Sequence, residues 1–417
     1  MLKAQIRYLY RLILSGHAED MAISTSLRNA HQWYARGEAQ RWRCPPAPQE
    51  VQAFHQSLPG YAPTPLVEAP TLARELGVAR VFVKDESARL ALPSFKVLGA
   101  SWAIFRALSS LAENDTSSNR DGTGPVTFAR LRTLALSLGR IQLVTATEGN
   151  HGHAVARIAS LLGLPADIWV PDVVPPDAIA RIRSEGAKVT VTAASYDKTV
   201  IEAAAYAGDT GSVLVQDTSW SGYEQIPEWI VEGYSTLFRE IDTQLHAAHA
   251  FPAGLVAIPI GVGSLAQAAI THYRSALPPA EVTVLGVEPD AAPCVLRSLV
   301  LGTPASVPAA TTNMTGLNCG TPSKIAWPYL EKGLDAAVTV TDHEAARAVD
   351  DLAAIGIASG PSGAASLAGV RAALLGAADR RTLLNVTAGT SLVLLSTEGR
   401  SGSPGDAQSS PVRPLAQ

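Results

Sequence analysis

Residues 141–162 read IQLVTATEGNHGHAVARIASLL, and this stretch decides the fold. Its first part, residues 141–147, is an apolar run rich in the residue types of strands. A turn that contains glycine and asparagine follows, and residues 151–162 then repeat apolar side chains at helical spacing. A strand that passes through a short turn into a helix is half of a βαβ unit, so the stretch predicts an α/β protein.

The same alternation continues on both sides of this stretch. Further short runs with strand composition occupy residues 81–83, 166–170, 188–191, 213–215, 255–260, 282–287 and 383–386. Helical patterns, such as residues 97–111, separate most of these runs, and the polar residues 113–124 predict a surface loop. We therefore expect an α/β fold of two domains, each a mostly parallel sheet covered by helices.

The composition is that of a globular protein that binds small molecules. Of the 417 residues, 47% are hydrophobic and 17% are charged, so the chain can bury a large core without disulfides or metal ions. The net charge is −4, and the lysines and arginines are scattered, which argues against a nucleic-acid partner. Cys44, Cys294 and Cys319 form neither a disulfide framework nor a repeated pair of metal ligands. We expect a reducing compartment and no metal site.

The two ends of the chain lie outside this pattern. The apolar run at residues 8–14 is interrupted by Arg11 and has no small-residue cleavage site, so it does not predict a signal peptide. No later segment is apolar for long enough to cross a bilayer, and we therefore expect a cytoplasmic protein without membrane contact. Residues 1–30 are interpreted as a disordered extension or a mis-assigned start, with Met21 as a second candidate start. Residues 400–417 predict a disordered tail.

Residues 93–100, PSFKVLGA, place Lys96 at the start of a predicted helix, after a strand and a turn. A lysine in this position can reach an aldehyde, and pyridoxal chemistry needs an amine that forms an imine and then shuttles protons at an α-carbon. Burial against Phe95 would lower the pKa of this amine. The alternative interpretation is a solvated lysine in the first turn of a helix.

The turn after residues 141–147 contains Glu148, Gly149, Asn150 and His151. Gly149 lets the backbone approach a ligand, and Asn150 can donate a hydrogen bond to an oxygen or a ring substituent. The free amides at the start of the following helix favour an anion such as a substrate carboxylate. An ordinary strand-to-helix turn uses the same residue types and is the alternative.

Residues 260–267, IGVGSLAQ, form a second glycine-containing turn between a strand and a helix. Its backbone amides and the helix dipole suit a phosphate group. The rival interpretation is a dinucleotide site, because Gly261, Gly263 and Ala266 imitate the G-x-G-x-x-A spacing. The acid that could bind a ribose, Glu288, lies in a Glu-Pro pair at the end of the next predicted strand, which weakens this rival.

Taken together and in this order, the lysine, asparagine and glycine motifs resemble the fold-type-II pyridoxal-phosphate enzymes, the group that contains threonine dehydratase and cysteine synthase. Further segments narrow the resemblance to the diaminopropionate ammonia-lyases, and the likeness covers roughly residues 31–399. These segments are PTPL at 63–66, VKDES at 83–87, VQDTSW at 215–220, GLNCG at 316–320, SGPSGA at 359–364 and LSTEG at 395–399. The most specific segment is residues 215–234, which general members of the fold lack.

The resemblance implies pyridoxal phosphate as the cofactor, bound to Lys96 as a Schiff base. Asn150 would contact the phenolic oxygen of the cofactor, and Ser396 or Thr397 would face its ring nitrogen. A neutral hydroxyl there leaves that nitrogen unprotonated, which suits elimination. The residues whose backbone amides would bind the phosphate are Gly261, Val262, Gly263, Ser264 and Leu265.

The substrate-binding residues that the resemblance implies are Ser94, Gly149, His151, Asp217 and Tyr223. Asp217 matches a family acid near the amino groups of the substrate, and the alternative is an aspartate that caps the next helix. The implied catalytic residues are Lys96, Glu148 and Asp217. Lys96 would take the α-proton of the L isomer and Glu148 that of the D isomer, because opposite faces need opposite bases. Asp217 or the released Lys96 would protonate the leaving amino group.

The implied reaction is the elimination of ammonia from 2,3-diaminopropionate, which gives pyruvate and ammonia. The alternatives on the same fold are a dehydratase for serine or threonine and a β-replacement synthase. A non-catalytic small-molecule sensor is the alternative from another class. The resemblance also implies a homodimer, with a large cofactor-binding domain at residues 31–96 and 216–399 and a small domain at residues 97–215.

Three residues depart from the family pattern. Glu148 stands where the family has aspartate, Pro361 where it has glutamate, and Arg400 where it has aspartate. Pro361 and Arg400 lie in segments that should flank the cofactor, and all three differences bear on which substrate and stereoisomer are used. Cys294 and Cys319 occupy family cysteine positions and form either a disulfide or two separate buried thiols.

Overall fold

The structure is a computed structural model that describes residues 31–114, 124–275, 281–308 and 310–400. The predicted extension at residues 1–30 lies outside the described residues. The same holds for the predicted tail after Arg400 and for most of the predicted loop at residues 113–124.

The described strands form two sheets. The larger sheet contains β1 (Trp33–Ala35), β2 (Leu66–Glu68), β3 (Arg80–Asp85), β8 (Leu255–Pro259), β9 (Thr283–Pro289), β10 (Ala336–Val340) and β11 (Ser391–Ser396). The smaller sheet contains β4 (Leu143–Ala146), β5 (Ala166–Pro171), β6 (Lys188–Thr192) and β7 (Val213–Leu214). Each sheet therefore gathers strands from a different part of the chain.

Both sheets are mostly parallel. The order in the larger sheet is β1-β10-β9-β8-β11-β3-β2, and only the two edge pairs, β1 with β10 and β2 with β3, are antiparallel. The order in the smaller sheet is β6-β5-β4-β7, and all its pairs are parallel. Every residue of β8, β9 and β10 is buried, as expected for strands covered on both faces.

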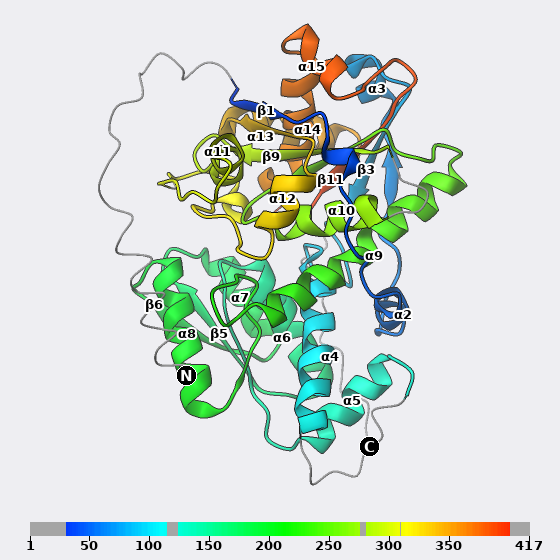
Figure 1. The fold of residues 1–417 in the computed structure, drawn as a ribbon. Helices are drawn as coiled ribbons and strands as arrows, with labels where there is room; N and C mark the ends of the chain where they lie inside the picture. The colour runs from blue at the N-terminus through cyan, green and yellow to red at the C-terminus, as the bar shows by residue number, and fades with distance from the viewer. Residues whose placement is uncertain (1–30, 115–123, 276–280, 309, 401–417) are drawn as a thin grey trace.

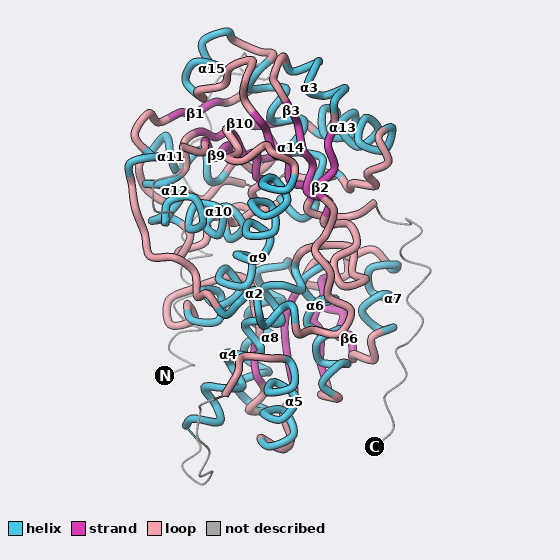
Figure 2. Tube along the Cα trace, turned by 90° about the vertical axis from the view of Figure 1, so that its right-hand side faces the viewer, coloured by secondary structure: helices cyan, strands magenta, loops and turns pink. Residues whose placement is uncertain are grey.

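Helices cover both sheets. Those beside the smaller sheet are α4 (Lys96–Asn114), α5 (Phe128–Ser137), α6 (Asn150–Leu162), α7 (Pro176–Ser184) and α8 (Tyr196–Thr210). The others are α2 (Glu50–Gln56), α3 (Pro70–Leu76), α9 (Gln225–Ala247), α10 (Ser264–Ser275), α11 (Cys294–Leu301), α12 (Trp327–Gly333), α13 (Asp342–Ala354), α14 (Pro361–Leu374), α15 (Ala378–Leu383) and the short η2 (Ala39–Arg41) and η3 (Thr315–Leu317). In Figure 1 the larger sheet lies at the top and the smaller sheet at the bottom, and α9 runs across the middle. Figure 2 shows the same two layers from the side.

The α/β fold with mostly parallel sheets is confirmed, and so are the predicted helices at residues 97–111 and 151–162, which are α4 and α6. One predicted strand is wrong. Residues 383–386 form the end of α15 and a turn in which Asn385 has a φ of 55°, and the strand of this region is β11. A short apolar run does not distinguish a strand from a buried helix end, which explains the error.

Helices α4 and α9 meet backbone to backbone where Gly99 faces Gly233. A Cβ atom on Gly233 would lie 2.5 Å from the carbonyl oxygen of Leu98, and one on Gly99 would lie 2.6 Å from the ring of Tyr234. No side chain fits in either position. The absence of both Cβ atoms therefore sets the distance between the two helices.

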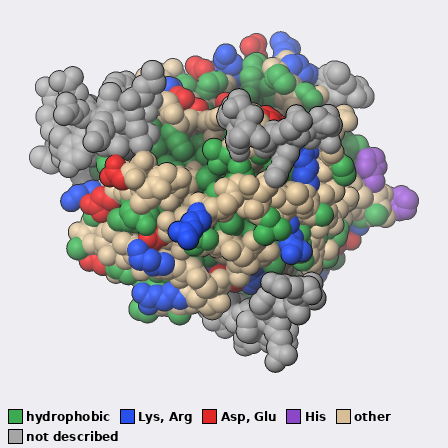
Figure 3. Space-filling view, turned by 90° about the horizontal axis from the view of Figure 1, so that it is seen from below, with side chains coloured by type: hydrophobic (Ala, Val, Ile, Leu, Met, Phe, Trp, Pro, Cys, Tyr) green, Lys and Arg blue, Asp and Glu red, His purple; other side chains and the backbone are tan. Residues whose placement is uncertain are grey.

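Apolar helices, metal-ligating side chains and surface charge bear on what else the described residues could bind. No helix in the described part of the chain combines the length and the apolar character needed to cross a membrane. The described residues also contain no group of three or more His, Cys, Asp or Glu side chains that could hold a metal ion. On the face drawn in Figure 3, Lys and Arg side chains are scattered among uncharged atoms rather than gathered in one patch.

Candidate active site

A cavity of about 1060 Å³, including the part open to solvent, lies where strands of both sheets end. Its walls come from the starts of five helices, α4, α6, α8, α10 and α14, and from the segments after β4, β7, β8 and β11. Helix α9 and the short η3 also contribute lining residues. Ligands bind at the carboxyl ends of parallel strands in folds of this kind. The predicted site residues that line the cavity are Ser94, Lys96, Glu148, Gly149, Asn150, His151, Asp217, Gly261, Val262, Gly263, Ser264, Leu265 and Thr397.

Lys96 begins α4 and points its amine into the cavity. The Nζ atom lies 2.9 Å from Oδ2 of Asp217, and 28% of the side chain is exposed. Burial lowers the pKa of Lys96, but the negative charge of Asp217 outweighs burial and raises that pKa above its ordinary value. Lys96 is therefore paired inside a cavity, and the interpretation as a solvated lysine is wrong.

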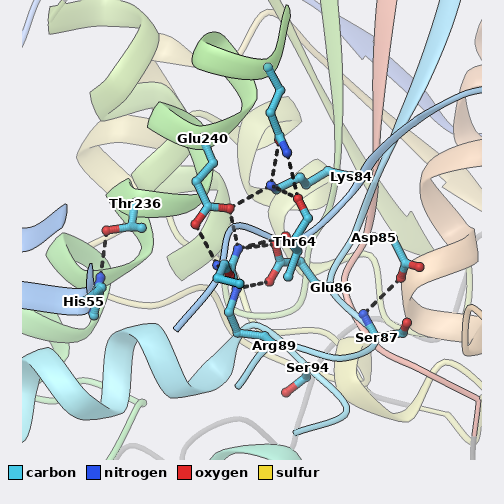
Figure 4. Close-up of polar contacts among 12 residues, drawn as sticks. His55, Thr64, Lys84, Asp85, Glu86, Ser87, Arg89, Ser94, Thr236 and Glu240 are labelled. Atoms are coloured by element: carbon cyan, nitrogen blue, oxygen red, sulfur yellow. Dashed lines mark hydrogen bonds and ion pairs between the residues drawn. The ribbon is translucent and has the colours of Figure 1, made fainter. Parts of the chain in front are cut away.

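The turn before Lys96 is held by a buried network of charges. Glu240 on α9 accepts hydrogen bonds from Lys84 and Arg89, both at 2.7 Å, and Arg89 also donates to Glu86 at 2.7 Å. All four side chains are at most 2% exposed. Figure 4 shows Glu240 facing both cations, with Glu86 and Thr64 beside the guanidinium. The network ties β3 and the following turn to α9.

Asp217 is the negative centre of the cavity. Burial raises the pKa of Asp217, but the nearby His151 and Lys96 outweigh burial and hold that pKa at about 2. His151 Nε2 lies 2.7 Å from the carbonyl oxygen of Val215, and its Nδ1 lies 3.8 Å from Oδ2 of Asp217. The cap position at the start of α9 belongs to Glu224, so the interpretation of Asp217 as a helix cap is wrong.

Glu148 also lines the cavity, but its electrostatic environment is the opposite of that of Asp217. Burial raises the pKa of Glu148 to about 7, with further contributions from the charges of Asp217 and Asp197. A carboxyl group with this pKa exchanges its proton near neutrality. Glu148 can therefore act as an acid or as a base.

Asn150 and Glu398 meet across the cavity. Asn150 Nδ2 donates to Oε2 of Glu398 at 2.8 Å, and the backbone N–H of Ser362 donates to Oε1 at 3.3 Å. Burial raises the pKa of Glu398. The backbone of Glu398 also pairs with Ser94, so this residue links the lysine turn, the asparagine turn and α14.

The glycine turn at residues 260–267 adopts a conformation that suits an anion. Gly263 has a φ of 104°, and a Cβ atom there would lie 2.6 Å from a methyl group of Leu330. Helix α10 begins at the next residue, and the first amides of a helix have no partner within it. The dinucleotide rival is wrong on physical grounds, because the carboxylate of Glu288 is fully buried and accepts from the amides of Val295 and Leu296.

Two predicted residues do not line the cavity. The hydroxyl of Ser396 is fully buried and donates to Ser359 at 2.8 Å, whereas the neighbouring Thr397 does line the cavity. The hydroxyl of Tyr223 donates to the carbonyl oxygen of Leu214 at 2.8 Å, and its ring stacks on Trp220. The hydroxyls of Ser396 and Tyr223 are therefore already hydrogen-bonded within the protein and do not face the cavity.

Cys294, Cys319 and the three residues that differ from the family pattern are placed differently relative to the cavity. Cys294 and Cys319 are free thiols in the structure, so the predicted alternative of a disulfide is not formed. Cys319 lines the cavity, and the thiol of Cys294 lies 3.7 Å from the carbonyl oxygen of Gly261. Pro361 starts α14, and Arg400 lies on the surface, 3.7 Å from Asp350. Of the three residues that differ from the family pattern, only Glu148 lines the cavity.

Tyr196, Tyr234 and Glu398 line the cavity but were not predicted as site residues. Glu398 follows the end of β11, and a polar residue directly after a buried parallel strand is a signal that could have identified it. Tyr196 begins α8 after a predicted strand and gives a weaker signal of the same kind. Tyr234 lies inside α9, where no local pattern indicates which residue faces a ligand.

The chain matches known proteins over most of its length. A family model described as "Pyridoxal-phosphate dependent enzyme" matches residues 57–388. The diaminopropionate ammonia-lyase of Salmonella typhimurium is 35% identical, over 84% of this chain and 88% of that protein. The protein of the same name from Escherichia coli K12 is also 35% identical, over 84% of this chain and 87% of that protein.

Solved structures give the same result. Holo diaminopropionate ammonia lyase from Escherichia coli has a TM-score of 0.78 and 31% identity, over 88% of this chain and 93% of that chain. A structure of that enzyme in complex with an aminoacrylate-PLP azomethine reaction intermediate has a TM-score of 0.76 and 30% identity, over 88% of this chain and 94% of that chain. The chain therefore belongs to the pyridoxal-phosphate-dependent enzyme family, as a relative of the diaminopropionate ammonia-lyases.

Proposed function

We propose that this protein eliminates ammonia from 2,3-diaminopropionate and yields pyruvate and ammonia, with pyridoxal phosphate bound to Lys96. The observation that carries the proposal is the 2.9 Å contact between the amine of Lys96 and Asp217, in a cavity that also contains the glycine turn. An amine and an ionised acid at this distance provide one group for the cofactor and one for a cationic substrate.

The residues of the cavity fit the cofactor. Lys96 would hold it covalently, and the amides of residues 261–265 would bind its phosphate. Asn150 would donate to its phenolic oxygen, and Thr397, rather than the buried Ser396, would face its ring nitrogen. When bound, pyridoxal phosphate withdraws electrons from the α-carbon of the substrate and makes its proton acidic.

Two bases can take the α-proton. We assign Lys96 to the L isomer and Glu148 to the D isomer, because the two isomers present this proton on opposite faces. The pKa of Glu148, about 7, leaves a large fraction of this side chain as carboxylate near neutrality. Glu148 is one methylene longer than the aspartate of the family pattern, and its side chain still lines the cavity.

Asp217 binds the amino group that leaves. Its pKa of about 2 means that Asp217 is a carboxylate at any working pH and accepts hydrogen bonds only. It therefore favours the β-amino group as an ammonium, which already carries the proton with which it departs as ammonia. Because Asp217 carries no proton, Lys96 rather than Asp217 would protonate a leaving amino group that is not yet an ammonium. The released unsaturated amine then hydrolyses in water to pyruvate and a second ammonia.

The α-carboxylate of the substrate would bind at the start of α6. Gly149, Asn150 and His151 line the cavity at the start of this helix, where the first amides have no partner within the helix, and Ser94 also lines the cavity. The Nδ1 atom of His151 has no hydrogen-bond partner among the described residues, and His151 also lines the cavity. We keep Ser94, Gly149 and His151 as substrate-binding residues and leave out Tyr223, whose hydroxyl is already paired.

A dehydratase that acts on serine or threonine is the second candidate. A threonine deaminase from T.th. has a TM-score of 0.66 and 27% identity, over 86% of this chain, which favours this reaction more weakly. The deciding assay is the release of pyruvate or another 2-oxo acid from each diaminopropionate isomer, serine and threonine. A faster reaction of serine than of either diaminopropionate isomer would refute the ammonia-lyase assignment. Cofactor binding without any turnover would instead identify a sensor.

We further propose that the enzyme acts in the cytoplasm as a homodimer. The support for the cytoplasm is the presence of three cysteines that are all free in the structure, as expected in a reducing compartment. The support for the homodimer is the family resemblance alone. Light scattering of the purified full chain would measure the mass in solution, and a monomer would refute the dimer.

A further inference from the structure

Tyr234 lies in the segment that is most specific to the resemblance, residues 215–234, and the proposed function gives it no role. It is 1% exposed and lines the cavity from helix α9. Its hydroxyl has no partner at hydrogen-bond distance among the described residues, although Lys96 lies near enough to act on the pKa of the phenol. A buried donor without a partner is unfavourable, so a hydroxyl in such a position points to a partner that is present only during function.

The ring of Tyr234 is held in place on two sides. It packs against Phe95 with the ring centroids 4.8 Å apart, and the absence of a side chain on Gly99 makes room for it. The amine of Lys96 lies 5.7 Å from the centroid of the same Phe95 ring. The phenol and the amine therefore flank one aromatic ring, inside one cavity.

The two groups also affect each other electrostatically. Burial raises the pKa of Tyr234 to about 12, although the charge and the proximity of Lys96 act in the opposite direction. The phenol therefore keeps its proton under ordinary conditions and can donate a hydrogen bond. In the structure, where Lys96 is paired with Asp217, this donor is unused.

A neutral amine needs a different partner from a charged one. The carboxylate of Asp217 can only accept, so it holds Lys96 while the amine is charged. A tyrosine hydroxyl can also donate, and the lone pair of a neutral amine accepts such a bond. Lys96 must be neutral whenever it takes a proton. A neutral amine has lost the charge that attracts it to Asp217, so Asp217 alone fixes its position weakly.

We propose that Tyr234 is a positioning residue for Lys96, and that its hydroxyl donates a hydrogen bond to the neutral amine and keeps it aimed into the cavity. The inference rests on the proposed function where it concerns the two substrate isomers. The hydroxyl of Tyr234 acts through Lys96 and not through Glu148. Loss of this hydroxyl should therefore lower turnover more for the L isomer, whose α-proton Lys96 takes.

The test uses Tyr234→Phe, which removes one oxygen atom and leaves the ring contacts intact. The matched control is Tyr273→Phe, because Tyr273 is also buried with an unpaired hydroxyl but lies outside the cavity. We expect Tyr234→Phe to lower kcat for the L isomer by about ten- to a hundredfold, as expected for the loss of one hydrogen bond to a reacting group, with KM within about twofold. The D isomer should lose less, and Tyr273→Phe should leave both isomers unchanged.

A second readout does not depend on turnover. Pyridoxal phosphate is added to the full chain from which the cofactor has been removed, and the rise of its visible absorption band is timed. Tyr234→Phe should slow this rise about tenfold, and Tyr273→Phe should not. An unchanged rise, or an equal loss for both isomers, would overturn the inference. If the wild-type protein turns over neither isomer, the proposed function fails, and the rise of the band still decides the role of Tyr234.

Discussion

The side-chain amide of Asn150 donates a hydrogen bond to Oε2 of Glu398 over 2.8 Å, although the two residues are 248 positions apart in the sequence. A carboxylate can only accept, so this bond fixes which end of the amide is the nitrogen. The second N–H of the same nitrogen remains for a ligand. Glu398 therefore orients Asn150 toward the cofactor that we propose.

The first prediction concerns Glu398. Glu398→Ala should weaken the binding of pyridoxal phosphate about ten- to a hundredfold, because a hydrogen bond to a charged group contributes about 1.5–3 kcal/mol. Fluorescence titration of the full chain with the cofactor measures this change. Glu232→Gln is the control, because Glu232 pairs with Trp102 away from the cavity and should leave the affinity unchanged. An unaltered Kd in Glu398→Ala would contradict the orienting role.

The second prediction concerns the pH dependence of the D isomer. Glu148 must be a carboxylate to take a proton, and its pKa is raised to about 7, so kcat/KM for the D isomer should rise with pH through a midpoint near this value. Glu148→Gln should lower turnover of the D isomer by about 10²–10⁴-fold, the usual contribution of a general base. Pyruvate release from each isomer over a pH series checks both statements. An equal loss for the L isomer would contradict the assignment.

The third prediction concerns the choice between amine and hydroxyl substrates. Asp217→Asn keeps the shape of the side chain and removes its charge. The ratio of kcat/KM for diaminopropionate to that for serine should fall about ten- to a hundredfold, because only the first substrate has a β-ammonium for the carboxylate to bind. Using a ratio cancels any general effect on Lys96. A ratio that stays constant would mean that Asp217 does not recognise the amino group.

The fourth prediction concerns stability. Glu240→Gln leaves Lys84 and Arg89 with Glu86 as their remaining carboxylate, and the free energy of unfolding should fall by about 3–5 kcal/mol. Urea denaturation measures this change. Glu228→Gln is the matched control, because Glu228 is exposed on the same helix and should change stability by less than about 0.5 kcal/mol.

The charge on Glu240 also predicts an acid sensitivity. Burial raises the pKa of Glu240, but Arg89 and Lys84 outweigh burial and lower that pKa from 4.5 to about 2. The stabilisation is therefore fully present above the ordinary value and is lost as the pH falls from about 4.5 toward 2. Glu240→Gln should show a smaller loss of stability over the same pH range. A wild-type protein that is equally stable throughout that range would contradict the prediction.

The larger part of the fold could be predicted because strands buried on both faces have continuous apolar sequences. The run at residues 255–260, for example, became β8. The edge strands β1 and β2 have three residues each, and their formation depends on partners far along the chain. The true strand β11 was missed because an apolar helix end just before it imitated a strand.

The site was predictable where chemistry depends on a local motif. The motifs placed Lys96 and Asn150 correctly on the cavity, because each begins a helix directly after a turn. The motifs gave no information on hydroxyl groups, since Ser396 turns toward Ser359. Tyr234 faces the cavity only because α9 crosses α4 at a particular angle and depth, which is a property of packing and not of its neighbours in the sequence.

The close crossing at Gly99 and Gly233 restricts how this protein can be redesigned. Even alanine at either position would push two long helices apart, and those helices carry Lys96 and Tyr234, which both line the cavity. A library that randomises the chamber for new amino acids should therefore keep both glycines fixed. Diversity belongs in the loops around them, where a change of side chain leaves the spacing of the reactive groups intact.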